Sequence, residues 1–281
     1  MRVIKIILIL IQSAPLLHAQ NLATSSPYSM FGLGEYAYGL HGQNSAMGGV
    51  AYGIRNPWFI NTENPAGLAG LEMNKLYFNA SIFLKSENYK SEGEKNDAVT
   101  GNCSAFTIAG KISPWWTTAI GLSPYTSVGY LFKDKRPLEG TPGSFVNSTY
   151  EGEGGISQLS FTNSIELNKS LSIGANIGYL FGSSTQKETQ DIMAVENEMS
   201  SRACYSDFGI QYNYRKNSHT SFTFGAVYGL KQKVSVKSKI TVKTITDPVE
   251  VDNKKTAQYI PQFFGVGGAV KHHKTTYALD Y

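Results

Sequence analysis

The chain has 281 residues, of which only 16% are charged, while Gly (28), Tyr (17) and Phe (14) are frequent. Ordinary soluble domains carry about 25% charged residues, so this composition favours β-structure with an unusually apolar surface. The net charge is +4 and the basic residues are spread along the chain, which argues against a nucleic-acid partner.

The first 19 residues have the pattern of a secretory signal peptide. Arg2 and Lys5 form a basic start, residues 6–11 an apolar core, and Ala19 a small-residue cleavage site. The apolar core is too short for a membrane-spanning helix, which needs about 20 residues, and no later stretch is continuously apolar for that length. We therefore expect an exported protein, and if it is in a membrane, it is there as strands.

Residues 20–74 form a second region, in which residues 44–71 are rich in Gly, Ala and Asn. Within it, Asn64, Pro65 and Ala66 can start a short helix, because Asn is a good N-cap and Pro is accepted at the first helical position. Small residues in short turns suit a segment that folds back inside a larger structure. The alternative is a surface linker in front of a domain.

From residue 75 to residue 281 the chain alternates between bulky apolar and small or polar residues, which predicts half-buried strands. We count nine, and antiparallel pairing is expected for all of them. Their apolar positions span 76–84, 106–108, 116–132, 159–167, 171–181, 208–214, 222–242, 260–270 and 277–281. A soluble sandwich would also alternate, so the alternation alone does not decide the fold.

The predicted connections alternate between long and short. The long ones, near 85–97, 133–153, 183–199 and 244–255, are polar, and the short ones lie near 112–115, 168–170, 215–219 and 271–274. Outer-membrane barrels combine short periplasmic turns with longer extracellular loops and aromatic girdles, so we expect the long loops to face the cell exterior. Candidate girdle residues are Trp115, Trp116, Tyr130, Phe132, Tyr179, Phe181, Tyr212 and Tyr214.

The seventh predicted strand continues into an arm with lysines on one face and branched apolar residues on the other. The lysines are Lys231, Lys233, Lys237, Lys239 and Lys243. One interpretation is a cationic surface for lipopolysaccharide phosphates or a ligand carboxylate. The other, which we favour, is a strand edge kept soluble by Lys.

Motifs for covalent chemistry are missing. There is no Gly-x-Ser-x-Gly and no His-Glu-x-x-His, so we expect no enzyme, no metal and no cofactor, with a lipase or deacylase assembled by the fold as the remaining alternative. Cys103 and Cys204 are far apart in sequence and could be buried small residues or one disulfide.

One stretch carries a family resemblance. AMGGVAYGIRNPWFINTENPAGLAGLE, with Asn64, Pro65 and Ala66 as its Asn-Pro-Ala motif, resembles the N-terminal segment of the FadL family of outer-membrane long-chain fatty-acid transporters. SPYSMFGLGEY is similar to the start of a branch common in Bacteroidetes, although members usually carry Arg where Met30 stands. YIPQFFGVGGAVKHHKTTYALDY resembles the family's late hairpin.

The resemblance implies an all-β, antiparallel up-and-down transmembrane barrel whose N-terminal segment is a hatch, with Asn64, Pro65 and Ala66 as the constriction. It implies passage of hydrophobic, fatty-acid-like molecules through a plugged lumen, and as partners outer-membrane lipid, lipopolysaccharide and that hydrophobic ligand. The known ligand-contacting residues of the family have no counterpart here. The alternative function is a FadL-like interaction or shuttle component of the type IX secretion system, with secretion-system proteins as partners.

The strand count also leads to an expectation about the chain itself. Single-chain bacterial barrels have an even number of strands, and the FadL family has fourteen. Nine strands would leave the sheet unclosed, so we expect a truncated chain that forms an open, curved sheet with free edges at the strands that begin at Lys75 and Lys274. The competing interpretation makes the last predicted strand, 277–281, the end of a smaller closed barrel.

Overall fold

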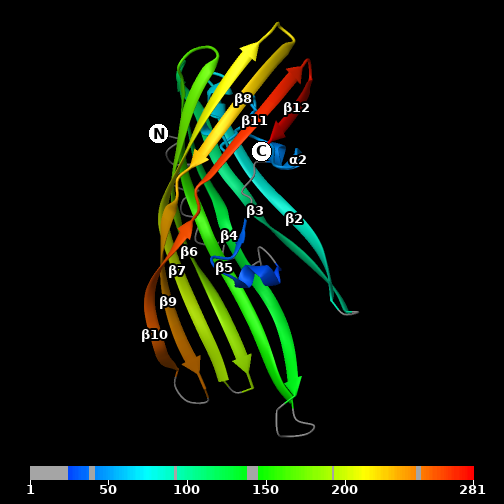
Figure 1. The fold of residues 1–281 in the computed structure, drawn as a ribbon, viewed down its shortest axis with the longest axis vertical. Helices are drawn as coiled ribbons and strands as arrows, with labels where there is room; N and C mark the ends of the chain where they lie inside the picture. The colour runs from blue at the N-terminus through cyan, green and yellow to red at the C-terminus, as the bar shows by residue number, and fades with distance from the viewer. Residues whose placement is uncertain (1–24, 38–41, 92–93, 138–144, 192, 245–247) are drawn as a thin grey trace, which may run out of the picture.

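A computed structural model describes residues 25–37, 42–91, 94–137, 145–191, 193–244 and 248–281. The fold is an antiparallel sheet curled into a half-barrel (Figure 1), and its continuous path contains nine strands in the order β12-β11-β8-β7-β6-β5-β4-β3-β2. The strands are β2 (Leu76–Ser91), β3 (Glu94–Ser113), β4 (Trp116–Pro137), β5 (Phe145–Glu166), β6 (Leu171–Gln190), β7 (Met193–Arg215), β8 (Thr220–Gly229), β11 (Phe263–His272) and β12 (Thr275–Asp280). The predicted all-β class and the nine strands are confirmed.

The seventh predicted strand, 222–242, is broken into two strands, and residues 249–255 of a predicted long loop belong to a further strand. β9 (Gln232–Lys243) follows β8, and β10 (Val249–Ile260) precedes β11. The first half of β7 pairs with β9 and its second half pairs with β8. The two shorter strands β8 and β9 therefore lie along the same long strand, β7. Pro261 separates β10 from β11, as expected of a residue that cannot donate a ladder hydrogen bond.

The outer surface of the sheet carries an apolar band. On β6 the band runs from Ile173 to Phe181, close to the 9–11 residues of a spanning strand, and the large apolar side chains there are exposed. Cross-strand pairing continues it sideways: Ile177 lies opposite Phe161, and Ile173 lies opposite Ile165 and Ile210. So large an exposed apolar surface suits contact with lipid rather than with water.

The long polar segments are not loops, as the sequence had suggested, but extensions of the strands. The ladder between β2 and β3 continues to the pair Ser91 and Glu94. The ladder between β6 and β7 continues to the pair Gln190 and Met193. Ladder pairing uses backbone groups, so polar side chains do not interrupt it. Figure 1 shows these extensions at the end opposite to the short turns, and their exposure to the cell exterior remains a prediction.

A line of irregularities crosses the sheet where the apolar band ends, and we call it the break line. It contains the register shift between Pro124 and Thr126 of β4, the positive-φ residue Gly154 of β5, and the interruption after Gly229. A one-residue shift turns every following side chain to the other face. Tyr130 is therefore buried, and its assignment to an aromatic girdle is wrong.

Residues 27–36 cover a gap in the wall. β3 pairs with β4 only over residues 106–113, beyond which the β2–β3 hairpin diverges (Figure 1). There β1 (Glu35–Tyr36) pairs with Thr126 and Ser127 of β4. η2 (Pro27–Met30) adds Ser29, whose hydroxyl accepts from the Gly129 N–H at 3.0 Å.

The inner face carries two separate apolar clusters. One joins Ile60, Leu68 and Leu71 of the N-terminal region to Ala109 and Ala119 of the wall. The other lies beyond the break line and consists of Ile156, Leu180, Ala203, Val234, Val236 and Ile260. No helix in the described part of the chain is long and apolar enough to cross a membrane.

Within the described residues the sheet is open, because β2 and β12 each pair with a strand on one side only. This confirms the predicted open sheet and its two edges. Cys103 and Cys204 are both free and exposed, so neither expectation for them, burial or a disulfide, is correct.

The apolar band gives a first testable prediction. Replacing Ile177 by Lys should lower the free energy of unfolding in phospholipid vesicles by about 2–4 kcal/mol, the effect of Lys at the middle of a lipid-facing strand. Ser183, on the same face of β6 beyond the break line, is the matched site: Ser183→Lys should change stability little. Equal effects of the two substitutions would contradict a lipid-facing band.

The polar extensions give a second prediction. In a variant whose two cysteines are replaced by Ser, a cysteine at Lys187 should react with a membrane-impermeant maleimide in intact cells. A cysteine at Asn217, in a short turn, should react only after the outer membrane is permeabilised. The reverse pattern would show that the orientation is opposite.

Candidate functional site

Residues 51–71, which we call the inner segment, lie on the inner face of the sheet and are held there through their backbone. Asp280 of β12 accepts from the Ala51 and Tyr52 amides at 2.6 and 2.8 Å. Gln211 of β7 is fully buried and donates to the Tyr52 and Ile54 carbonyls at 2.9 and 3.0 Å. Asn61 and Asn64 of the segment itself also donate to the Ala51, Tyr52 and Ile54 carbonyls, so polar side chains from both sides stand in for the secondary structure that this segment lacks.

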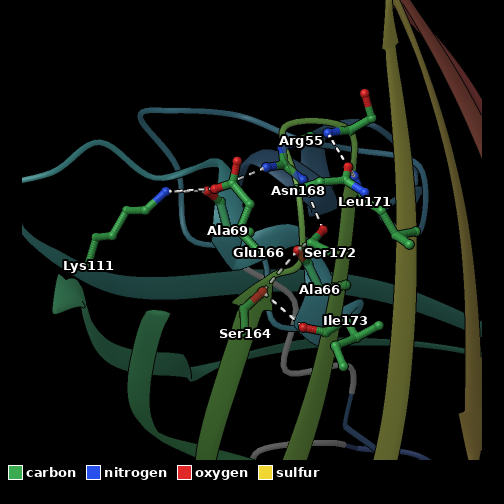
Figure 2. Close-up of polar contacts among 11 residues, drawn as sticks. Arg55, Ala66, Ala69, Lys111, Ser164, Glu166, Asn168, Leu171, Ser172 and Ile173 are labelled. Carbon is green, nitrogen blue, oxygen red and sulfur yellow. Dashed lines mark hydrogen bonds and ion pairs between the residues drawn. The ribbon is translucent and has the colours of Figure 1, made fainter. Parts of the chain in front are cut away.

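Figure 2 shows the same arrangement at η3 (Pro65–Gly70), the short helix that ends the inner segment. Ser164 of β5 and Ser172 of β6 both donate to the Ala66 carbonyl, at 3.1 and 3.0 Å. Lys111 of β3 donates to the Ala69 carbonyl at 3.0 Å. Helix-end carbonyls need such partners, and here three different strands supply them.

An ion network ties the inner segment to the wall beside η3 (Figure 2). Glu166 accepts from Lys111 at 3.0 Å and pairs with Arg55 at 3.7 Å, and Arg55 also donates to the Ser172 hydroxyl at 2.9 Å. All three charged side chains are at most 21% exposed. Burial lowers the pKa of Arg55 and the nearby Glu166 opposes that shift.

The predicted short helix at Asn64, Pro65 and Ala66 is confirmed, as a 3-10 helix. The Asn64 side chain accepts from the Ala66 amide at 3.1 Å and Pro65 occupies the first turn. Gly174 and Gly209 face these residues so closely that an added Cβ would lie 2.4 Å from the Ala66 amide nitrogen or 2.1 Å from the Asn64 Oδ1 atom. The role of the three residues as a constriction remains a prediction.

A cavity of about 450 Å³ lies between the inner segment and the wall at the break line. Its most notable groups are two carboxylates, Glu63 of the inner segment and Asp207 of β7, accompanied by Tyr52, Tyr125 and Tyr205. None of the described residues that line it is Lys, Arg or His. The cavity therefore has a negative character without an internal counter-charge.

Glu63 is the titratable group that links the cavity to the inner segment. Burial raises its pKa from 4.5 to about 7, because the charged form is poorly solvated there. The facing titratable groups are Tyr52, Tyr205 and Asp207, and none of them supplies a positive charge. Burial also raises the pKa of Tyr52, and the Glu63 charge adds to the rise.

Sequence reasoning did not single out Glu63, Asp207, Gln211 or Asp280. Asp207, Gln211 and Asp280 are single polar residues in mostly apolar strands, Glu63 stands in the polar run of residues 61–64, and no spacing motif connects the four. The available signal was that Gln211 and Asp207 have the parity opposite to Ile210 and Phe208, which predicts an inward side chain. Their meeting with residues 51–63 depends on the curl of the sheet.

The described residues contain no group of three or more His, Cys, Asp or Glu side chains arranged to hold a metal ion. In comparisons with known proteins, the sequence matches the BamG family over residues 1–275. No curated protein and no solved structure matches it. The chain belongs to the BamG family.

This membership overturns the FadL assignment and the lipid-transport function drawn from it, and it gives no support to the alternative role in type IX secretion. The misleading resemblance has a physical origin. Asn64 caps a helix, Pro65 starts it, and small neighbours allow close contact with Gly174 and Gly209. Any segment packed this tightly on a sheet would favour the same residue types.

The expected lipid, lipopolysaccharide and hydrophobic-ligand partners are wrong for the same reason. The lysine row on β9 has partners within the protein: Lys239 pairs with Glu250 at 3.3 Å, and Lys243 pairs with Glu196. Val234 and Val236 on the other face are buried. β9 pairs with β7 on one side and with β10 on the other, so the favoured interpretation of the lysines as protection of a strand edge is wrong. Their charges are partly matched by carboxylates on these neighbouring strands.

The close contact at Gly174 gives a third prediction. Gly174→Ala should weaken docking of the inner segment by about 1–3 kcal/mol, because a methyl group must displace backbone atoms of η3. Limited proteolysis should then cut within residues 51–71 earlier than in the wild type. Gly110→Ala is the control, since its Cβ would meet only ordinary contacts at 3.7 Å; equal proteolysis of the two variants would contradict the tight fit.

The raised pKa of Glu63 gives a fourth prediction. Its folded-state pKa lies above its unfolded value, so folding favours the neutral acid, and the free energy of unfolding should fall as pH rises from about 4.5 to about 7. Glu63→Gln should match the wild type at pH 4 and exceed its stability at pH 8, by on the order of 1–3 kcal/mol. Glu72→Gln, at a surface pair with Lys75, is the control. Identical pH profiles for the wild type and Glu63→Gln would contradict the burial effect.

Proposed function

We propose that this chain is a membrane-embedded component of the Bam complex, the machinery that assembles proteins into the bacterial outer membrane. The observation that carries the proposal is the match to the BamG family over residues 1–275, nearly the whole sequence. The family and the β-rich fold are consistent with a location at the outer membrane. Residues 1–19 would direct export.

The architecture supports a role as an integral subunit. The outer face presents an apolar band about one spanning strand high. On the inner face, polar side chains of β3, β5, β6, β7 and β12 form hydrogen bonds with the inner segment. In this proposal the inner segment acts as a plug on the inner side of the half-barrel. It stays in place because the wall satisfies its backbone groups.

The proposed role is non-enzymatic. Assembly partners are recognised by binding, and the partners we propose are proteins of the Bam complex rather than a transported compound. The polar strand extensions beyond the break line offer one surface for such contacts, because Lys237, Lys239 and Lys243 of β9 are exposed there. Glu196 of β7 and Glu250 of β10 lie on the strands at either side of β9.

Affinity purification of the tagged full chain from mildly solubilised membranes tests the proposal. The expected result is co-purification of outer-membrane assembly proteins, together with a loss of folded, heat-modifiable outer-membrane proteins when the chain is depleted. Complementation should succeed with the wild type and with Ser183→Lys, and fail with Ile177→Lys, which should not remain in the membrane. A chain that purifies alone, and whose depletion leaves folded levels unchanged, would refute the role.

A further inference from the structure

The cavity at the break line contains two carboxylates that the protein itself does not neutralise. Asp207 accepts a single side-chain hydrogen bond, from Asn176 Nδ2 at 3.2 Å. Glu63 has no hydrogen-bond or ion-pair partner among the residues that the structure describes, and its accessible surface faces the cavity. Unpaired carboxylates in a poorly solvated site are unfavourable, so a cation from outside the chain would be stabilised there.

The walls of the cavity suit an organic cation rather than a bare metal ion. Tyr125 and Tyr205 stack with ring centroids 6.4 Å apart, and Tyr52 closes the side formed by the inner segment. Tyrosine faces attract ammonium and guanidinium groups, while the described residues offer no cluster of three metal-ligating side chains. Leu230 and Phe263 add apolar surface at the rim.

The polar groups that could orient a ligand are themselves fixed. Asn176 accepts from the Thr162 hydroxyl at 3.0 Å and donates to Tyr205 and Asp207. This leaves the second oxygen of Asp207, on the wall, and both oxygens of Glu63, on the inner segment, as acceptors that line the cavity. A planar guanidinium with several N–H donors, or an ammonium with three, fits such a set of acceptors.

We propose that this cavity binds an alkylguanidinium or alkylammonium group held between Glu63 and Asp207. The bound cation would bridge the inner segment and the wall, since one carboxylate comes from each. The cation could belong to a free small molecule or to an Arg or Lys side chain of a protein partner, and both sources use the same chemistry. The inference does not depend on the assembly role proposed above.

Titration calorimetry on the full chain in detergent micelles tests the inference at pH 8, where Glu63 is charged. The probe is benzamidine, and benzamide is the neutral control of the same shape. Benzamidine should bind saturably and at least about tenfold more tightly than benzamide. Its binding should weaken about tenfold in Glu63→Gln and in Asp207→Asn, a loss that corresponds to about 1.4 kcal/mol for each carboxylate, and should be unchanged in Glu72→Gln.

A second arm separates the two sources of the cation. If the pentapeptide Ala-Ala-Arg-Ala-Ala binds more tightly than benzamidine, a partner side chain is the ligand; if it binds more weakly, a free small molecule is. Equal binding of benzamidine and benzamide, no binding of either, or binding that survives both substitutions would overturn the inference. The comparison of benzamidine with benzamide needs only the wild-type protein, so it tests whether the cavity binds a cation even if a variant does not fold.

Discussion

The structure depends on how the inner face of the sheet satisfies the backbone of residues 51–71. This segment has one short 3-10 helix and otherwise irregular backbone, so its buried N–H and C=O groups have few partners within the segment. Leaving such groups unpaired away from water costs several kcal/mol for each group. The wall supplies many of the partners, through Asp280, Gln211, Ser164, Ser172 and Lys111. Asn61 and Asn64 of the segment itself supply others, by donating to the carbonyls of Ala51, Tyr52 and Ile54.

The break line explains how one sheet serves two environments. On the side of the break line with the short turns, the outward side chains are apolar, for example Ile177 and Phe161. On the other side the strands continue as the polar extensions. Register shifts and broken strands at this level turn the side chains and leave the space that becomes the cavity, which is lined by Pro124, Gly229 and Pro261. The irregular positions of the strands thus create the cavity between the inner segment and the wall.

Much of the fold could be predicted from the sequence, because period-two alternation reports directly on strands with one apolar face. The nine strands, the short turns and the helix start at Asn64 follow from local patterns. The errors came from features without a local signal. Long polar extensions look like loops, since side-chain polarity says nothing about ladder pairing, and the shift at Pro124 that buries Tyr130 is visible only in the register.

The site was less predictable than the fold. Asn64, Pro65 and Ala66 were found because capping is local, but Glu63 and Asp207 are 144 positions apart in the chain and meet only through the curl of the sheet. The family resemblance failed for a related reason. Short stretches of Gly, Ala, Asn and Pro reflect tight packing against a sheet, a requirement that unrelated families share.

Hydrogen–deuterium exchange of the full chain in lipid tests the central claim, that wall side chains hold the backbone of the inner segment. The amides of Ala51 and Tyr52, which donate to Asp280, should exchange at least about a hundredfold more slowly than in an unfolded peptide. Asp280→Ala should remove that protection while leaving the β5–β6 ladder protected. Exchange of residues 51–71 at the rate of an unfolded peptide in the wild type would contradict the account.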